Sequence, residues 1–97
     1  MTDLRKLAEG KKCYARLDGC LYSSDTVVLA HLRIGNIAGI GQKPPDICAL
    51  PCCHRCHDVI DGRTNIPIND RERIELLRGL LQWQAWLWNN GHIGVIK

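Results

Sequence analysis

The sequence predicts a small α+β domain that is held together by a metal ion and ends in a long helix. Three observations support this prediction: a length of 97 residues, six cysteines, and a run of apolar residues at helical spacing near the C-terminus. A domain of this size buries a limited share of its surface, so a crosslink is expected to stabilise it. We therefore expect one domain over residues 1–97.

Composition argues against a membrane protein and against a secreted one. Apolar residues make up 45% of the chain, but no apolar stretch approaches the roughly 20 residues that span a bilayer. Residues 1–10 contain four charged side chains and lack the apolar segment of a signal peptide, so we expect a cytoplasmic protein. Thiols stay reduced in the cytosol, and the six cysteines therefore indicate metal ligation rather than disulfides. The net charge of +3 is compatible with nucleic-acid binding but does not indicate it.

The first half of the chain is expected to contain short elements separated by loops. Residues 2–9 predict a short helix that ends at a glycine. Two short strands joined by a loop are expected within residues 13–29, where turn residues alternate with short apolar runs. The glycine-rich residues 35–41, followed by Lys-Pro-Pro-Asp at 43–46, predict a loop.

The second half predicts two helices. Residues 53–61 fit a helix of about two turns that ends before Gly62. A longer helix follows, which Asn69 or Asp70 can cap and which Asn90 with Gly91 can end.

The longer helix has a wide apolar surface. Its apolar residues form two neighbouring stripes, namely Ile74, Leu77, Leu81, Ala85 and Trp88, and then Leu76, Leu80, Trp83 and Leu87. Such a helix is either the main core element or part of a homodimer interface, and we favour the core.

The cysteines form a pattern that is typical of a zinc site. Cys53 and Cys56 make a Cys-x-x-Cys pair, whose tight turn directs two thiolates to one tetrahedral ion. Cys13 and Cys20 can supply the second pair, although the six residues between them exceed the usual zinc-knuckle spacing. We therefore predict a structural Zn²⁺ bound by these four thiolates.

The two remaining cysteines leave an alternative open. Cys52 could replace Cys53 as a zinc ligand if the turn were wider, and Cys48 could be a further thiol. Both also fit as small buried apolar residues.

A second group of residues could hold a different metal ion. His57 and Asp61 are four residues apart, so on a helix their side chains project from one face. An imidazole and a carboxylate at this spacing can bind a divalent ion and leave positions for water and phosphate. His31, at the end of an apolar strand-like run, could act as a general base beside that ion. Taken singly, each histidine also fits a purely structural role.

In this order, the residues resemble the HNH nuclease motif of phage-encoded, zinc-containing proteins. The resemblance lies in Leu29-Ala30-His31, Arg33, the loop ending at Asp46, and the segment Cys53 to His57. Residues 13–61 are also similar to the YbcO-like family of short phage and prophage proteins, which are described as candidate nucleases. This resemblance implies a ββα-metal core, in which a β-hairpin and a helix hold one metal ion.

The resemblance also implies roles for individual residues. His31 would be the general base, Asp46 would orient that base or its loop, and His57 would bind the catalytic metal. Asp61 stands where many relatives have a second histidine, and this change favours a harder ion such as Mg²⁺ or Mn²⁺. Ala30 stands where many HNH enzymes have a further metal ligand.

DNA is the expected partner of such a protein. Arg33, Lys43 and Arg55 are candidates for contacts with the phosphate backbone, although each also fits as an ordinary surface cation. The predicted function is metal-dependent hydrolysis of phosphodiester bonds in DNA by a phage or prophage endonuclease, which could work with a recombination protein. The alternative is a non-catalytic zinc-ribbon protein that binds DNA or assists recombination.

Overall fold

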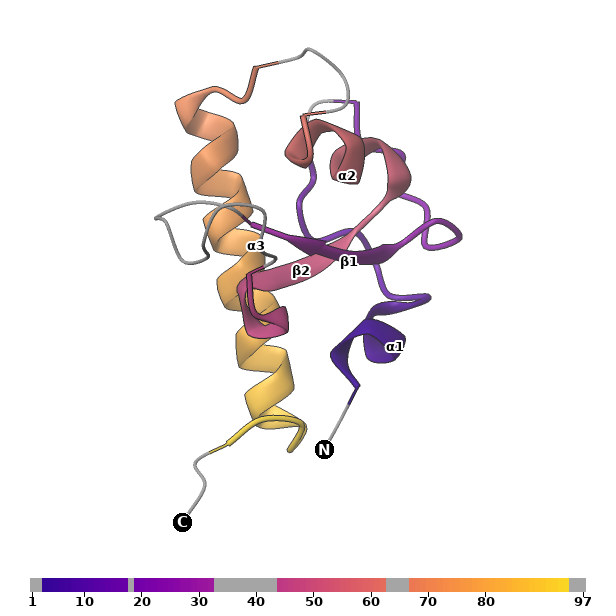
Figure 1. Ribbon diagram of the computed structural model, residues 1–97, viewed down its shortest axis with the longest axis vertical. Coiled ribbons are helices and arrows are strands. Elements are labelled where there is room, and N and C mark those ends of the chain that lie inside the picture. The colour runs from indigo at the N-terminus through magenta and orange to yellow at the C-terminus, as the bar shows by residue number, and fades with distance from the viewer. Residues whose placement is uncertain (1–2, 18, 33–43, 63–66, 95–97) are drawn as a thin grey trace.

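The computed structural model describes residues 3–17, 19–32, 44–62 and 67–94. These residues form a two-stranded antiparallel sheet surrounded by helices (Figure 1). The elements are α1 (Leu4–Ala8), β1 (Val28–His31), the 3₁₀ turn η1 (Asp46–Cys48), β2 (Ala49–Cys52), α2 (His54–Ile60) and α3 (Asp70–Asn89). The predicted α+β class with a long C-terminal helix is confirmed. None of the helices in the described ranges is long and apolar enough to span a bilayer.

The sheet joins two segments that lie far apart in the sequence. Val28 of β1 is opposite Cys52 of β2, and His31 is opposite Ala49. In Figure 1 α2 lies above this sheet, α1 lies below it, and α3 runs alongside. The register therefore places His31 beside the chain that enters β2.

The expectation of two strands within residues 13–29 is wrong. In the described part of that range, only the residues from Val28 onward are in a strand. The segment before them joins the sheet through one backbone hydrogen bond, in which the Tyr14 N–H donates to the Pro51 carbonyl at 2.8 Å. Its backbone bends instead so that the thiols of Cys13 and Cys20 approach each other. This bending prevents the extended conformation that a hairpin needs.

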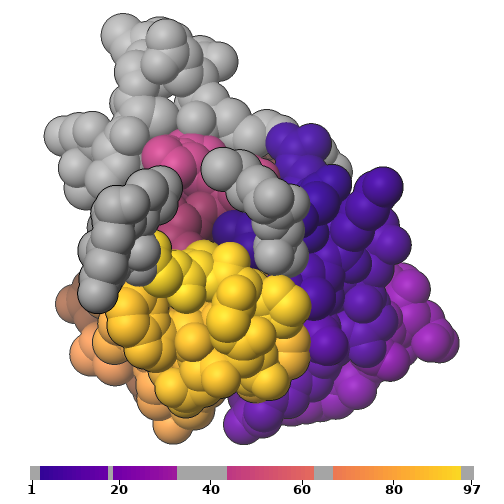
Figure 2. Space-filling view, turned by 90° about the horizontal axis from the view of Figure 1, so that it is seen from below, coloured from indigo at the N-terminus to yellow at the C-terminus, as the bar shows by residue number. Residues whose placement is uncertain are grey.

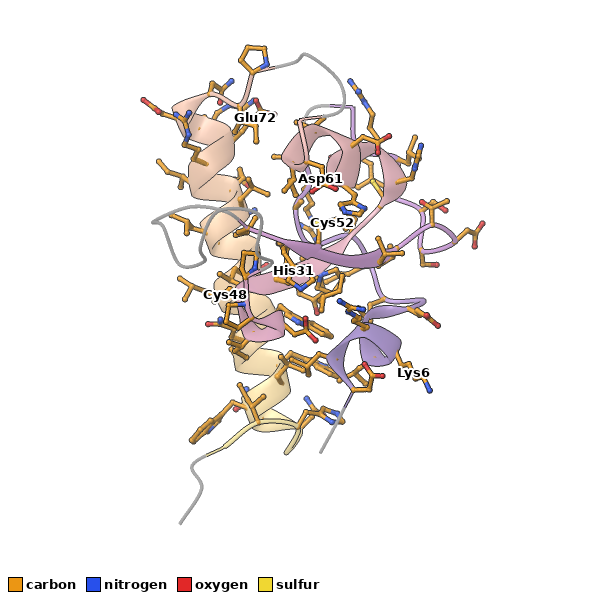
Figure 3. The ribbon with its side chains drawn as sticks, viewed as in Figure 1. Lys6, His31, Cys48, Cys52, Asp61 and Glu72 are labelled. Atoms are coloured by element: carbon orange, nitrogen blue, oxygen red, sulfur yellow. The ribbon has the colours of Figure 1, made fainter. Side chains whose placement is uncertain are left out.

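The ends of α3 are determined by local capping. The Asn69 side chain accepts a hydrogen bond from the Glu72 N–H at 2.8 Å, and the Glu72 carboxylate accepts one from the Asn69 N–H at 3.4 Å. This capping box explains why Glu72, labelled in Figure 3, is tolerated at 6% exposure. At the other end Gly91 has a φ of 77°, and the His92 N–H donates to the Leu87 carbonyl at 2.9 Å. Asn-Gly therefore ends the helix, as predicted.

The structure buries only one of the two apolar stripes of α3. Leu76, Trp83 and Leu87 are buried in the core. The large residues of the other stripe remain exposed, namely Ile74, Leu77, Leu81 and Trp88. The helix is therefore a core element, as favoured from the sequence, and it also has an apolar outer surface. The homodimer stays a prediction.

A glycine allows α3 to pack closely against the cysteine-bearing segment. A Cβ atom at Gly79 would collide with the Tyr14 carbonyl oxygen and would lie 3.0 Å from Leu50 Cδ1. The Tyr14 ring packs edge-on against Trp83, with ring centroids 5.4 Å apart. This contact holds α3 against both β2 and the residues that follow Cys13.

We expect Gly79→Ala to lower the free energy of unfolding by about 1–3 kcal/mol, because a backbone collision outweighs the ~1 kcal/mol that alanine gains in helix propensity. Urea unfolding followed by circular dichroism measures the change. Gln82→Ala, at an exposed position of the same helix, is the control and should change stability by no more than about 0.5 kcal/mol. An equally stable Gly79→Ala protein would contradict the close packing of α3 on Tyr14.

Candidate functional site

Four thiols converge at one point. The Sγ atoms of Cys13, Cys20, Cys53 and Cys56 all lie within 4.8 Å of one another, and Cys20 Sγ is 3.8 Å from Cys53 Sγ. Four sulfur ligands at 2.3 Å from a tetrahedral Zn²⁺ would be about 3.8 Å apart. The donor set and its spacing therefore fit zinc, and the four predicted cysteines form a cluster that could bind it.

Local hydrogen bonds help to position the thiols of Cys53 and Cys20. Cys53 occupies the N-cap position of α2, but its side chain makes no capping hydrogen bond. The Thr26 hydroxyl accepts from the His54 N–H at 3.1 Å instead, which leaves the Cys53 sulfur available to a metal. On the opposite side the Tyr22 N–H donates to Cys20 Sγ at 3.4 Å. Such backbone donors orient a ligand sulfur and stabilise its anionic form.

Cys52 and Cys48 lie outside this cluster. Cys52 is fully buried, and its thiol donates to the Leu50 carbonyl at 3.5 Å. Cys48 is half-buried in η1. The four-thiol cluster thus contains Cys53 rather than Cys52, and Cys52 is a small buried residue of β2 whose thiol contacts that of Cys13 from outside the group.

Their surroundings make two of these thiols, Cys20 and Cys56, difficult to ionise in the absence of a cation. The hydrogen bond with Cys13, followed by burial, raises the pKa of Cys56. Burial is also the main reason why the pKa of Cys20 rises to about 11. Conversely, hydrogen bonds from Cys52 and Cys56 lower the pKa of Cys13. A bound divalent cation would lower the pKa of these thiols, because it binds the thiolate form.

A histidine and an aspartate meet at the end of the sheet. His31 is the last residue of β1 and Asp46 is the first residue of η1, and His31 Nε2 lies 2.8 Å from Asp46 Oδ1 (Figure 3 labels His31). The His31 side chain is 10% exposed and that of Asp46 is 42% exposed. Arg5, from α1, places its Nε 4.0 Å from the same carboxylate oxygen. The strand register, extended by the Leu32 N–H donating to the Cys48 carbonyl at 3.0 Å, brings these residues together.

Helix α2 and its C-cap residue Asp61 contain two histidine–aspartate pairs, whose members are four residues apart. His57 Nε2 is 3.0 Å from Asp61 Oδ2, and both side chains are 26% exposed. His54 Nε2 is 3.2 Å from Asp58 Oδ2, with His54 well exposed. Two ligands at neighbouring corners of an octahedron with bonds of ~2.1 Å would be about 3 Å apart, so the spacing of the first pair fits a single divalent ion.

The predicted chemistry-bearing residues are arranged as two pairs rather than as one group. In the part of the chain that the structure describes, the cysteine cluster is the one set of three or more His, Cys, Asp or Glu donors within 4.8 Å of one another. Figure 3 shows His31 on the sheet and Asp61 at the end of α2. Among the described residues, His31–Asp46 and His57–Asp61 are therefore separate pairs, each with its own close contact.

Of the three predicted phosphate-binding residues, Arg55 lies within the described part of the chain. Arg33 and Lys43 lie outside the described residues. The Arg55 guanidinium lies against Gly19, where its Nε is 3.0 Å from the position that a Cβ would occupy. Arg55 of α2 thus packs against the turn that leads into Cys20, a member of the cysteine cluster.

Two residues of these ion pairs, Asp58 and Arg5, were not predicted from the sequence. Asp58 could have been found, because His54 and Asp58 repeat the spacing of His57 and Asp61. Arg5 could not, because no local pattern connects it with Asp46.

Comparison with known proteins extends the resemblance over most of the chain. Residues 2–92 match the family described as "Putative nuclease YbcO". Relatives with that description in Escherichia coli strain K12 and in Enterobacteria phage 82 are each 41% identical over 99 residues, which cover 100% of this chain and 99% of the relative. The solved "Structure of a putative bacteriophage protein from Escherichia coli str. K-12 substr. MG1655" has a TM-score of 0.72 and 34% sequence identity, and the match covers 92% of this chain and 100% of that one. The chain therefore belongs to the YbcO family.

Proposed function

We propose that the chain is a single-domain, metal-dependent endonuclease of the HNH type, which hydrolyses phosphodiester bonds in DNA. The contact that supports the proposal most directly is the 2.8 Å approach of His31 Nε2 to Asp46 Oδ1. A histidine oriented by a carboxylate is a common form of general base in hydrolytic enzymes. The relatives named as nucleases support the same class of reaction.

His31 would activate the attacking water. If its Nε2–H donates to Asp46, Nδ1 is unprotonated and can take a proton from water. Asp46 then holds the ring in one orientation and stabilises the imidazolium that forms. Because the His31 side chain is mostly buried, neighbouring residues also restrict its rotation.

His57 and Asp61 would hold the catalytic divalent ion, Mg²⁺ or Mn²⁺. Bound there, the ion would polarise the scissile phosphate and stabilise charge on the leaving oxygen. The imidazole and carboxylate are both partly exposed on α2, so a nucleic-acid strand can reach them. A nitrogen and oxygen donor set suits a harder ion than the thiolates do.

A structural Zn²⁺ at the cysteine cluster would join the N-terminal loop to the start of α2. Zinc binding at such sites contributes about 10–16 kcal/mol, comparable to or larger than the whole net stability of a small domain. It would thereby position β1 and α2 relative to each other.

We expect Cys20→Ser and Cys53→Ser each to reduce bound zinc from about one ion per chain to a small fraction, because each removes one of four thiolate ligands. Elemental analysis of the purified protein measures the metal content. Cys48→Ser, outside the cluster, is the matched control and should retain its zinc. Acidification should release zinc from the parent, because protons compete for the thiolates. Full zinc occupancy in both ligand variants would contradict the site.

We expect His31→Ala to slow nicking of plasmid DNA by at least about 100-fold, because a general base contributes roughly 10²–10⁴. The assay is run with Mg²⁺, Mn²⁺ or Ni²⁺. His92→Ala is the control, because His92 stacks on Trp86 with ring centroids 5.3 Å apart and has no part in the proposed chemistry. Unchanged nicking by His31→Ala would exclude this base. A zinc-loaded parent that binds DNA without nicking it would favour the accessory role.

The two pairs on α2 allow a matched test of the catalytic metal. His57→Ala should raise the Mn²⁺ concentration needed for half-maximal nicking by at least about 10–100-fold, since loss of a ligand should cost no less than loss of a supporting residue. His54→Ala removes the equivalent histidine of the neighbouring pair and should leave this concentration unchanged. Equal effects of the two substitutions would contradict the assignment of His57.

A further inference from the structure

Positive charge is concentrated in the N-terminal segment. Residues 3–17 contain two carboxylates and five cations, an excess of three that equals the net charge of +3 of the whole chain. The cations are Arg5, Lys6, Lys11, Lys12 and Arg16. The rest of the chain carries eight side chains of each sign. Clustering of basic residues in one segment is the usual electrostatic signature of nucleic-acid binding.

These cations are not neutralised in the way that those of α3 are. On α3, Arg73 pairs with Asp70 at 2.7 Å and Arg78 pairs with Glu75 at 2.8 Å. In the N-terminal segment, the ion pair found among the described residues is the long contact of Arg5 with Asp46 at 4.0 Å. Lys6, Lys12 and Arg16 are exposed, and in Figure 3 Lys6 points away from the sheet.

Aromatic rings hold two of the lysines in place. Lys11 Nζ lies 4.7 Å from the centroid of the Trp86 ring, and Lys12 Nζ lies 5.1 Å from that of Tyr14. Trp86 is itself stacked on the buried Trp83, with centroids 5.3 Å apart and planes at 5°. A cation–π contact restrains an ammonium group while its N–H donors can still reach an anion. Figure 2 shows the indigo N-terminal segment as a continuous surface beside the yellow C-terminal end of α3.

The same segment reaches the proposed general base. Arg5 approaches the Asp46 oxygen that pairs with His31. Asp3 accepts from the Arg5 N–H at 3.1 Å and caps α1, which holds this turn of helix in place. A phosphate backbone that followed the segment would therefore arrive beside His31.

From this placement we propose that residues 3–17 form the surface that binds the phosphate backbone of duplex DNA next to the scissile phosphate. The inference rests on the proposed nuclease function and adds to it the substrate-binding surface. Arg5 is a positioning residue at the end of that surface, where it contacts Asp46. Lys6, Lys12 and Arg16 extend the surface away from the reacting atoms.

The triple variant Lys6→Gln, Lys12→Gln, Arg16→Gln tests this surface. Fluorescence anisotropy with a labelled duplex, at several salt concentrations and without added divalent metal, measures binding separately from cleavage. Each lost phosphate contact should reduce the slope of log K against log salt by about 0.9, so we expect a reduction of roughly 2–3. The matched control is Arg71→Gln, Arg73→Gln, Arg78→Gln on α3, which changes net charge equally and should leave the slope nearly unchanged.

Three results would overturn the inference. Equal slope changes in the two triple variants would show that overall charge is responsible, and an unchanged slope in the N-terminal variant would place the DNA elsewhere. Parent protein that binds no duplex would also contradict it. The proposed function is tested separately: His31→Ala should bind duplex like the parent without nicking it, whereas the N-terminal variant should recover nicking at high protein concentration and low salt.

Discussion

The rest of the structure depends on the convergence of four thiols from two distant segments. Because Cys53 directly follows β2, the contact that brings Cys20 to it also determines how α2 leaves the sheet. The N–H of Tyr14, which follows Cys13, donates a hydrogen bond to β2. Gly79 of α3 packs closely against the Tyr14 carbonyl. One cluster therefore connects the sheet, α2 and α3, and the sheet formed by the described residues has two short strands. An isolated two-stranded sheet is marginally stable in water, so this sheet depends on its packing against the helices that the cluster helps to connect.

The parts of the fold that could be predicted are those encoded by a few neighbouring residues. The start of α3 follows from Asn69 and Glu72, and its end from Asn90 and Gly91. The sheet could not be predicted in this way, because the partner of β1 is a distant segment, Ala49–Cys52. That segment contains a proline and a cysteine, which do not indicate a strand. Its proline is accommodated because the Pro51 carbonyl, rather than an N–H group, makes the contact with Tyr14.

In the site, too, contacts between nearby residues could be predicted from the sequence, whereas contacts between distant residues could not. Spacing on a helix is enough to predict that His57 and Asp61 meet, because residues four apart share a face. The pairing of His31 with Asp46 was expected only from the resemblance to HNH nucleases, because the two residues are fifteen positions apart in the sequence. Arg5 approaches Asp46 only because α1 packs below the sheet, and no sequence pattern indicates that packing. Distant contacts of this kind depend on the β1–β2 register and on the packing of α1 against β1 and η1.

Neighbouring residues on α2 would serve two metals with different requirements. Cys56 belongs to the thiol cluster. The next residue, His57, is partly exposed and pairs with the Asp61 carboxylate. Thiolates prefer zinc, and a nitrogen and oxygen pair with open positions accepts a harder ion. If the proposed catalytic ion binds His57 and Asp61, this difference would keep it from exchanging with zinc in the thiol cluster. A change of the proposed catalytic ion would then leave the fold intact, because zinc in the thiol cluster would connect the chain independently of His57 and Asp61.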